Sequence, residues 1–404
     1  LAINSPFGTA YRLEKISNPK LKWEATKQLN AGVDISLIKG RIDLSFDVYN
    51  KQTTDMLLQL SVPSYLGGTG WQDIRAPFGN VGKMENKGFD LTLHTHNIEA
   101  KKFKWGTDIT FSRNRNLVKE LDDANRIYWR NLYWYSEFQT VTKTEAGQPL
   151  GMFYGYQTEG IFTSQEDILA HAVQVNNPNN DGKNLVDKRA GVWIGDVKFK
   201  DLNGDGVITT DDQTIIGNPN PDFTFGVNNS FSYGPFDLVV YLTGSYGADI
   251  LNYSRVQIEG MTNVYANQAA TVFNRAQYNL RDPNGSDLDP ANVTLANPGT
   301  DIPRPTTTDN NRNTRMSDRF IEDGSYLRLQ NVRMAYQLPV KFTKKYRVER
   351  MKLYVNAQNL YTFTKYTGYD PEIGAFNQDP LLQNVDMGRY PTPRVFTFGV
   401  DVDF

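Results

Sequence analysis

The end of the chain alternates between apolar and polar side chains without a break. Between Arg394 and the last residue, the apolar positions are Phe396, Phe398, Val400, Val402 and Phe404, and small or charged residues stand between them. Because successive side chains of a strand point to opposite faces, this pattern predicts a strand with one apolar face and one polar face. Such a strand, ending on an aromatic residue, is typical of a membrane-spanning barrel, where one face meets hydrocarbon and the other meets water.

Eight earlier segments show the same strand character and give about nine strands with the last one. They lie near residues 21–38, 41–50, 89–94, 105–112, 223–233, 236–246, 326–338 and 351–364. Short turns and very long connections alternate between the strands. The long connections, rich in Gly, Pro, Asn and Asp, cover residues 61–82, 122–219, 251–324 and 367–393.

The alternation of connection lengths predicts an orientation in a membrane. If the last strand runs inward, every short turn falls on the periplasmic side and every long loop is extracellular, as in outer-membrane barrels. We therefore predict an all-β protein, a transmembrane antiparallel β-barrel with long extracellular loops. About nine strands cannot close an even-numbered barrel, so we expect residues 1–404 to be the carboxyl-terminal portion of one barrel domain.

Residues 152–162 are a candidate for a further hairpin within the long connection 122–219. The alternative is a soluble β-sandwich protein with decorated loops.

The facing of the side chains follows from the alternation. The polar positions expected to line the lumen are Arg41, Asp43, Asp47, Asp90, Thr92, Asp108, Thr110, Asp237, Asp401 and Asp403. The positions expected to face lipid are Ile42, Leu44, Phe46, Phe89, Leu91, Phe223, Phe225, Leu238, Val240, Phe396, Phe398 and Val400.

Composition narrows the functional classes. Aromatic residues make up 12% of the chain, with 22 Tyr and 22 Phe, which suits aromatic girdles at membrane interfaces. The 43 basic residues are balanced by 45 acidic ones, which argues against a nucleic-acid partner. The chain contains no Cys and three His, so thiolate chemistry is excluded and little material remains for a histidine-based catalytic site.

One segment has the spacing of a calcium-binding loop. In residues 201–212 the ligand positions would be Asp201, Asn203, Asp205, the Val207 carbonyl, Thr209 and Asp212, with Gly206 at the sharp turn. The last position is Asp where Glu is usual, so its reach is shorter. We expect a structural Ca²⁺ ion that stiffens an extracellular loop. The alternative is a solvated Asp/Asn/Gly turn without an ion.

Aromatic residues cluster in two of the predicted extracellular loops. Candidates for contact with a ligand or a partner protein are Trp71, Trp129, Tyr133, Trp134 and Tyr135. Flat aromatic faces stack on sugar rings and anchor protein interfaces. The alternative is that these residues belong to the girdle at the lipid interface or to loop packing.

Nothing in the sequence indicates catalysis or an organic cofactor. Asp122–Asp123 and Asp211–Asp212 are adjacent carboxylates, but no nucleophile or second acid is placed opposite them, and solvated loop charges are favoured. No phosphate-binding Gly loop and no nucleophile elbow is present. His94 and His96 share the polar face of one strand; with no third ligand indicated, lumen-lining residues are the favoured interpretation.

Several short motifs, in order along the chain, resemble the barrel of the SusC/RagA family of TonB-dependent outer-membrane transporters. The match runs from about residue 18 to residue 404. The motifs are NPKLKWE (18–24), NVGKMENKGF (80–89), FKDLNGDG (199–206), IGNP (216–219), GSYG (244–247), DGSYLRL (323–329), QNL (358–360) and YTGYDPE (366–372).

The resemblance implies a function and partners. It implies part of a 22-stranded barrel in the outer membrane of a Gram-negative, Bacteroidetes-type bacterium, in contact with membrane lipid. The family imports oligosaccharides or peptides with a SusD-like surface lipoprotein, and TonB would act through an amino-terminal plug and TonB box that this sequence does not contain. Two alternatives stay open: a transporter-like barrel that acts as a scaffold in a surface assembly, and a secreted all-β carbohydrate-binding protein.

Overall fold

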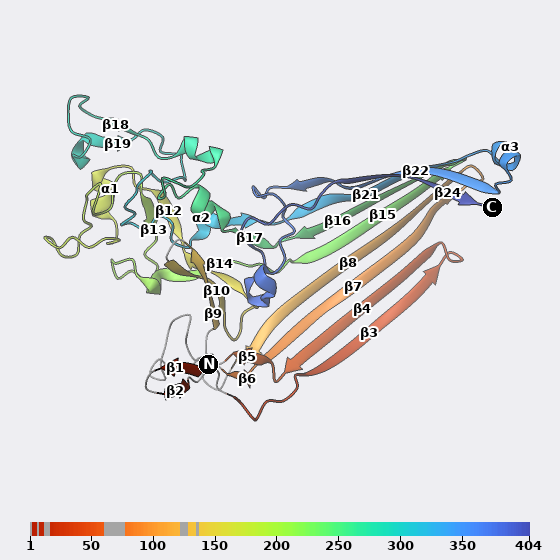
Figure 1. The fold of residues 1–404 in the computed structure, drawn as a ribbon, viewed down its shortest axis with the longest axis horizontal. Coiled ribbons are helices and arrows are strands. Elements are labelled where there is room, and N and C mark those ends of the chain that lie inside the picture. Colours follow the sequence, from red (N-terminus) through yellow and green to blue (C-terminus); the bar gives the residue numbers. More distant parts are fainter. Residues whose placement is uncertain (1, 6–7, 12–16, 60–76, 122–127, 135–136) are drawn as a thin grey trace.

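The main element of the structure, a computed structural model, is a nine-stranded antiparallel sheet (Figure 1). The structure describes residues 2–5, 8–11, 17–59, 77–121, 128–134 and 137–404. The strands of the sheet are β3 (Ala25–Leu37), β4 (Ile42–Thr54), β7 (Lys83–Glu99), β8 (Phe103–Glu120), β15 (Phe223–Tyr233), β16 (Phe236–Tyr246), β21 (Tyr326–Gln337), β22 (Arg350–Thr364) and β24 (Val395–Asp403).

The strands of this sheet lie in the order of the sequence. Each strand pairs with the one before and the one after it, from β3 at one edge to β24 at the other. The two edge strands do not pair with each other, so the sheet is an open, curved wall. The predicted strands and their antiparallel arrangement are confirmed. β7 and β8 extend beyond their predicted segments because both continue through the polar residues next to the long connections.

The register keeps the apolar side chains of neighbouring strands on one face. Phe46 lies opposite Leu91, Leu91 opposite Phe111, and Phe111 opposite Phe225. Directly paired residues of an antiparallel sheet point to the same side, so the alternation of each strand adds up to one apolar face. This face crosses the entire sheet.

The short connections lie at one end of the sheet (Figure 1). They cover residues 38–41, 100–102, 234–235 and 338–349, and the last contains α3 (Val340–Thr343) and η6 (Lys344–Tyr346). At the tightest of them, Gly234 has a φ of +57°. A residue with a side chain rarely adopts this conformation, which explains the Gly at this turn.

The other elements lie towards the opposite end of the sheet and belong mainly to the long connections (Figure 1). The strands are β1 (Ala2–Ser5), β2 (Gly8–Tyr11), β5 (Leu57–Gln59), β6 (Phe78–Asn80), β9 (Tyr128–Trp134), β10 (Glu137–Thr144), β11 (Met152–Tyr156), β12 (Thr158–Ile161), β13 (Val197–Phe199), β14 (Gln213–Gly217), β17 (Asp249–Asn252), β18 (Tyr278–Leu280), β19 (Val293–Leu295), β20 (Ile321–Asp323) and β23 (Val385–Asp386). The helices are α1 (Gln165–Ala170), α2 (Ser254–Ile258), η2 (Thr210–Asp212), η3 (Ala270–Asn274), η4 (Pro290–Asn292), η5 (Asp318–Phe320), η7 (Phe376–Gln378) and η8 (Pro380–Leu382).

The candidate hairpin at residues 152–162 does not form. β11 pairs with β10 and β14, and β12 pairs with β13. These strands therefore build small sheets within the long connection and do not extend the nine-stranded wall.

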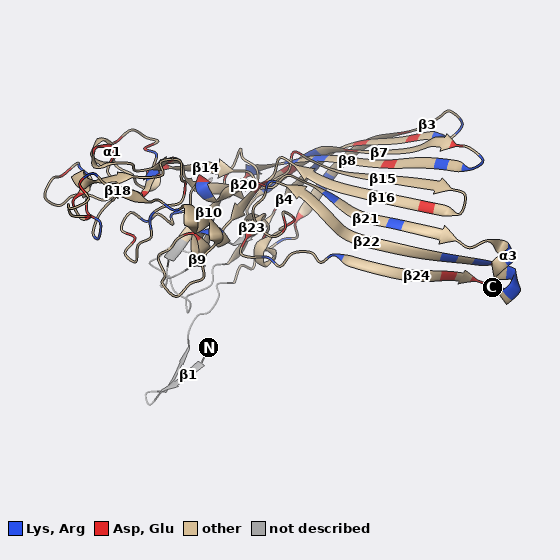
Figure 2. Cartoon of the chain, turned by 90° about the horizontal axis from the view of Figure 1, so that it is seen from above, with Lys and Arg blue, Asp and Glu red and all other residues tan. Residues whose placement is uncertain are grey.

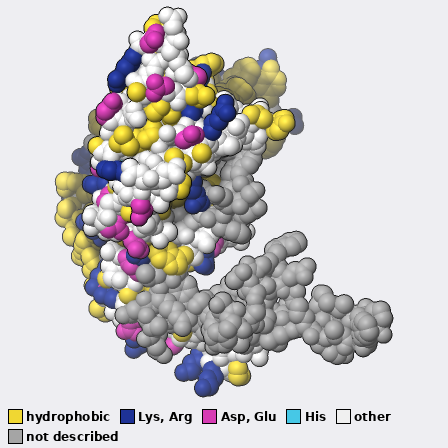
Figure 3. All heavy atoms as spheres, turned by 90° about the vertical axis from the view of Figure 1, so that its left-hand side faces the viewer, with side chains coloured by type: hydrophobic (Ala, Val, Ile, Leu, Met, Phe, Trp, Pro, Cys, Tyr) yellow, Lys and Arg dark blue, Asp and Glu magenta, His cyan; other side chains and the backbone are white. Residues whose placement is uncertain are grey.

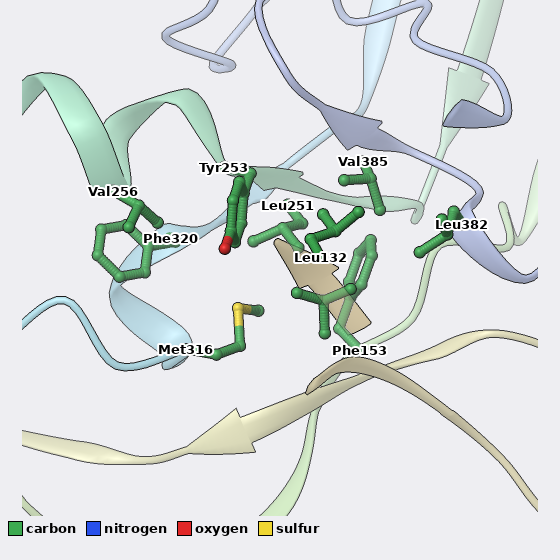
Figure 4. Packing of buried hydrophobic residues seen from close by; sticks show 10 residues of the cluster. Leu132, Phe153, Leu251, Tyr253, Val256, Met316, Phe320, Leu382 and Val385 are labelled. Atoms are coloured by element: carbon green, nitrogen blue, oxygen red, sulfur yellow. The ribbon is translucent and has the colours of Figure 1, made fainter. Parts of the chain in front are cut away.

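Three of the long connections, those after β8, β16 and β22, share a hydrophobic core, which makes them a folded layer (Figure 4). Leu132, Val141 and Phe153 come from the connection between β8 and β15 and pack with Leu251 and Phe320 of the next long connection. The rest of this core is Tyr253, Val256, Met316, Leu382 and Val385. We call this assembly of long connections the loop layer. Within the described ranges, none of the helices is long and apolar enough to span a bilayer.

Candidate functional site: the polar face and the loop layer

The polar face of the sheet carries rows of hydroxyl and carboxylate groups. One row runs through Asp47, Asp90, Ser112 and Thr224 on four adjacent strands. Next to it lies a hollow of about 640 Å³. Its lining includes Asp90, Thr92, Thr110, Ser112, Thr224, Tyr241, Thr243, Tyr326, Gln330 and Glu372. This face is therefore polar and rich in hydrogen-bonding groups, as predicted for the lumen of a barrel.

Two side-chain hydroxyl groups lie close to the backbone of Gly226 in this hollow. A Cβ atom at Gly226 would lie 2.8 Å from the Thr110 hydroxyl oxygen and 3.1 Å from the Tyr241 hydroxyl oxygen. Only Gly leaves room for the two hydroxyl groups to lie over the strand.

Ion pairs cross the polar face nearer the short turns, and Figure 2 marks the charged positions along the strands. Lys352 lies 2.5 Å from Asp237, which also accepts a hydrogen bond from the Ser232 hydroxyl at 2.7 Å. Arg333 pairs with Asp401 at 3.4 Å. These half-exposed pairs link β16, β21, β22 and β24, but solvent screening limits the contribution of each to stability.

The loop layer is anchored to the polar face by one buried arginine. Arg328 of β21 is 2% exposed. Its guanidinium pairs with the carboxylates of Asp370 and Glu372, the latter at 2.9 Å, and donates to the Thr362 hydroxyl at 3.0 Å. Burial alone would raise the pKa of Asp370, but the N–H groups of Glu372 and Thr392 and the charge of Arg328 outweigh it and hold the pKa below its ordinary value.

The same connection contains a second buried polar contact. The Tyr366 hydroxyl donates to Asp386 at 2.5 Å. Burial, followed by this hydrogen bond, raises the pKa of the Tyr366 phenol far above its ordinary value, so the phenol stays protonated. Tyr366 packs with Ile250 and Ile373 in a small core. Residues 365–394 are thus held by buried contacts and are tied to the polar face through Arg328.

The motifs of the family resemblance meet in pairs. Arg328 lies in DGSYLRL, and its partners Asp370 and Glu372 lie in YTGYDPE. Asn80, from NVGKMENKGF, accepts from the backbone N–H of Lys22 in NPKLKWE at 2.7 Å and donates to its carbonyl at 2.8 Å. Each of these motifs therefore supplies one partner of a contact with another motif that is distant in the sequence.

Within the loop layer, a buried carboxylate joins two long connections. Asp196 is fully buried and accepts hydrogen bonds from the Trp193 backbone N–H at 2.8 Å and the Asn313 side chain at 2.9 Å. The Arg304 guanidinium pairs with it at 2.7 Å. A buried ion pair of this kind needs such hydrogen bonds to offset its desolvation. Figure 3 shows that the outside of the loop layer mixes acidic, basic and apolar side chains.

A row of stacked aromatic rings crosses the apolar face of the sheet near the loop layer. The rings of Phe89, Phe111, Phe223 and Tyr246 stack in succession across four strands, with centroids 5.7, 5.1 and 5.2 Å apart. All four point to the apolar face. Cationic side chains follow on the side of the loop layer and line a cavity of about 730 Å³ together with Phe89; they are Lys87, Arg113, Arg115 and Lys119. Aromatic rings followed by cations are typical of a lipid headgroup region.

The structure places the predicted calcium loop on the loop layer, closed by its own hydrogen bonds. The Asp201 carboxylate accepts from the backbone N–H groups of Gly204 at 2.7 Å and Gly206 at 2.8 Å, and these bonds, the one from Gly206 first, lower its pKa. Asp212 is fully buried and accepts from Leu202 and Thr209. Gly206 has a φ of +84°, as expected for the residue at the sharp turn of this loop.

The side chains of this loop hydrogen-bond to one another and to the backbone of the turn. Among the described residues, no group of three or more His, Cys, Asp or Glu side chains is arranged to hold a metal. The other predicted ligands, Asn203, Asp205, the Val207 carbonyl and Thr209, lie along the same turn, where Asn203 and Asp205 hydrogen-bond each other at 2.9 Å. Calcium therefore stays a prediction.

The aromatic candidates lie in different places. Trp129 belongs to β9, is 40% exposed, and packs against Tyr154 with ring centroids 4.8 Å apart. Lys143 lies 5.6 Å from the Trp129 ring. Tyr133 and Trp134 lie further along β9, paired with Phe138 and Glu137 of β10. Trp71 and Tyr135 lie outside the described residues. The ring contacts favour loop packing for Trp129, and contact with a ligand or partner stays a prediction for the set.

Sequence reasoning gave no role to Arg328, Asp370 or Asp196. A signal was present for Arg328, since it occupies a polar-face position of a strand within a recognised motif, and a long charged side chain there needs a partner. No such signal existed for Asp196, whose partners Arg304 and Asn313 are 108 and 117 residues away.

The fold and the polar face define a class of protein: the wall of a membrane-spanning antiparallel barrel, with a wet inner face and a folded extracellular layer. The family described as "TonB dependent receptor-like, beta-barrel" matches residues 3–360. The chain belongs to this family of outer-membrane proteins, and the resemblance to SusC and RagA is confirmed. The apolar face is therefore the lipid face, and the family consists of receptors and transporters, not enzymes.

Named relatives cover the whole chain. TonB-dependent receptor P3 of Formosa agariphila is 34% identical over 97% of this chain and 35% of its own length. TonB-dependent receptor SusC of Bacteroides thetaiotaomicron is 25% identical over 99% of this chain and 34% of its own length. The chain spans about a third of the length of these curated relatives.

A solved structure has the same fold. The chain superimposes on the RagAB peptide transporter with a TM-score of 0.72 and 22% identity, covering all of this chain and 38% of that one. At this identity the likeness concerns the fold alone.

Proposed function

We propose that the chain is part of a TonB-dependent importer that carries oligosaccharides or peptides across the outer membrane of a Bacteroidetes-type bacterium. The observation that carries the proposal is the loop layer, in which three long connections share one core and one of them pairs with Arg328 of the polar face. Such a layer offers a rigid surface for a ligand and for a lid protein. The SusC relative and the RagAB peptide transporter support the assignment.

We propose a SusD-like lipoprotein as the partner at the loop layer. TonB would act through an amino-terminal plug, as in the family. The test is extraction of the natural polypeptide from outer membranes in mild detergent, affinity purification, and mass spectrometry of the bound proteins. A stoichiometric SusD-like lipoprotein, with plug peptides on the same polypeptide, is expected. Recovery with neither, or with other envelope machinery, would contradict the importer and favour a scaffold role.

Trp134→Ala tests the aromatic contact prediction. Truncation of an aromatic anchor at an interface costs about 2 kcal/mol or more, so we expect lipoprotein binding or ligand uptake to fall by more than tenfold. Trp129→Ala is the comparison, because the Trp129 ring already packs on Tyr154. Unchanged binding and uptake in the Trp134 variant would remove this residue from the functional surface.

Calcium titration tests the loop at residues 201–212. If the prediction holds, isothermal titration of the purified protein gives a binding signal that Asp201→Ala abolishes. Asp211→Ala is the matched control, because position 11 of such a loop supplies no ligand. A wild-type protein without a calcium signal would leave a hydrogen-bonded turn as the correct interpretation.

A further inference from the structure

We propose that His94 and His96 form a site for a divalent transition-metal ion on the polar face of the sheet. Both residues lie on β7, two positions apart, close to the short connection 100–102. Their Nε2 atoms are 3.3 Å apart. The sequence favours lumen-lining residues over a metal site because it indicates no third ligand. The short distance between the two nitrogens can be seen only in the structure.

The separation of the two nitrogens matches a shared ion. Zinc binds imidazole nitrogen at about 2.0–2.1 Å, and two ligands of a tetrahedral zinc are then about 3.3–3.4 Å apart. The ring centroids are 4.8 Å apart at an interplanar angle of 88°, so the two rings are nearly perpendicular, with their Nε2 atoms next to each other.

A carboxylate positions the first histidine. His94 Nδ1 hydrogen-bonds one oxygen of Asp108 on β8, and the other oxygen accepts from the Asn228 side chain of β15 at 3.1 Å. Donation from Nδ1–H to a carboxylate leaves the Nε2 lone pair free for a metal. This arrangement is usual behind histidine ligands, where it sets the tautomer and raises ligand basicity.

A carboxylate also lies near the second histidine, beyond hydrogen-bond distance. His96 Nδ1 lies 3.7 Å from a Glu99 carboxylate oxygen. Within this part of the barrel the side chains of His94 and His96 are 43% and 42% exposed. No third His, Cys, Asp or Glu among the described residues completes the set, so water or a solute ligand would fill the remaining positions.

The ligand chemistry selects the ion. Neutral imidazole suits Zn²⁺, Cu²⁺ and Ni²⁺, whereas Ca²⁺ and Mg²⁺ prefer oxygen ligands. In the competing arrangement, His96 Nε2–H donates a hydrogen bond to His94 Nε2 and no ion binds. Metal titration separates the two.

The test is titration of the full-length natural polypeptide with Zn²⁺, purified in detergent and checked for folding by heat-modifiable migration. Wild type is expected to bind one more zinc ion than His94→Asn or His96→Asn. His171→Asn is the matched control and is expected to match wild type, since this third histidine packs on Phe162 in the loop layer. Asp108→Asn is expected to keep the stoichiometry and weaken affinity about 10–100-fold.

The opposite results overturn the proposal. Equal numbers of bound zinc ions in wild type and both histidine variants would leave a hydrogen-bonded pair in place of a metal site. If His94→Asn fails to fold, His96→Asn decides alone, because His96 does not carry the hydrogen bond to Asp108. Unchanged affinity in Asp108→Asn would remove the positioning role of that carboxylate.

Discussion

Arg328→Ala is expected to release residues 365–394 from the polar face. The substitution leaves Asp370, itself 6% exposed, without its cation in a buried environment. Removal of one partner of a buried ion pair costs about 3–5 kcal/mol. The Glu372 side chain is 57% exposed, so most of the loss falls on Asp370. The expected result is much faster amide hydrogen exchange in residues 366–392, measured by mass spectrometry on the folded protein in detergent.

Arg333→Ala is the matched control on the same strand. Its side chain is 43% exposed and pairs with Asp401 at 3.4 Å, so its removal is expected to cost less than about 1 kcal/mol. Exchange in residues 366–392 should then stay at the wild-type rate. Equal exchange in the two variants would show that Arg328 does not anchor the loop layer.

Phe398→Arg is expected to impair assembly of the barrel. Phe398 lies on the apolar face opposite Val355 and is 75% exposed in the sheet, so its side chain meets lipid. A cation placed on this face near the bilayer centre costs about 2–4 kcal/mol. The measurement is the fraction of heat-modifiable, folded protein in outer membranes.

Thr397→Arg tests the facing from the neighbouring position. Thr397 lies opposite Asn356 on the polar face, where an added charge meets water. We expect near wild-type assembly for this variant. A folded fraction lower in Thr397→Arg than in Phe398→Arg would reverse the assignment of lipid and lumen faces.

The strands and their facing could be predicted because both are local properties. A membrane strand must present apolar side chains to lipid at every second position, so Phe396 to Phe404 report the face without knowledge of any partner. The short turns account for the pairing within β3–β4, β7–β8, β15–β16 and β21–β22, whereas the other neighbouring pairs are joined by the long connections. Loop lengths then gave the orientation, since long and short connections alternate at the two ends.

The contacts inside the loop layer could not be predicted. The core that joins Leu132, Leu251 and Leu382 brings together three connections without a repeating pattern, and only packing decides which apolar side chains meet. For the calcium loop, the spacing of the ligand positions can be predicted from the sequence, but the direction of each carboxylate depends on the backbone N–H groups that compete for it. The fold brings Asp201 to Gly206 and buries Asp212 in hydrogen bonds.

For His94 and His96, one property follows from the sequence and another depends on the tertiary structure. Their shared face follows from the sequence, because residues two apart on a strand point the same way. The convergence of their Nε2 atoms and the placement of Asp108 behind His94 were decided by rotamers and by the register of β7 with β8. The same holds for Arg328 and Asp370, 42 residues apart. Alternation along a strand is set by covalent geometry, whereas contacts between distant segments depend on how the whole chain packs.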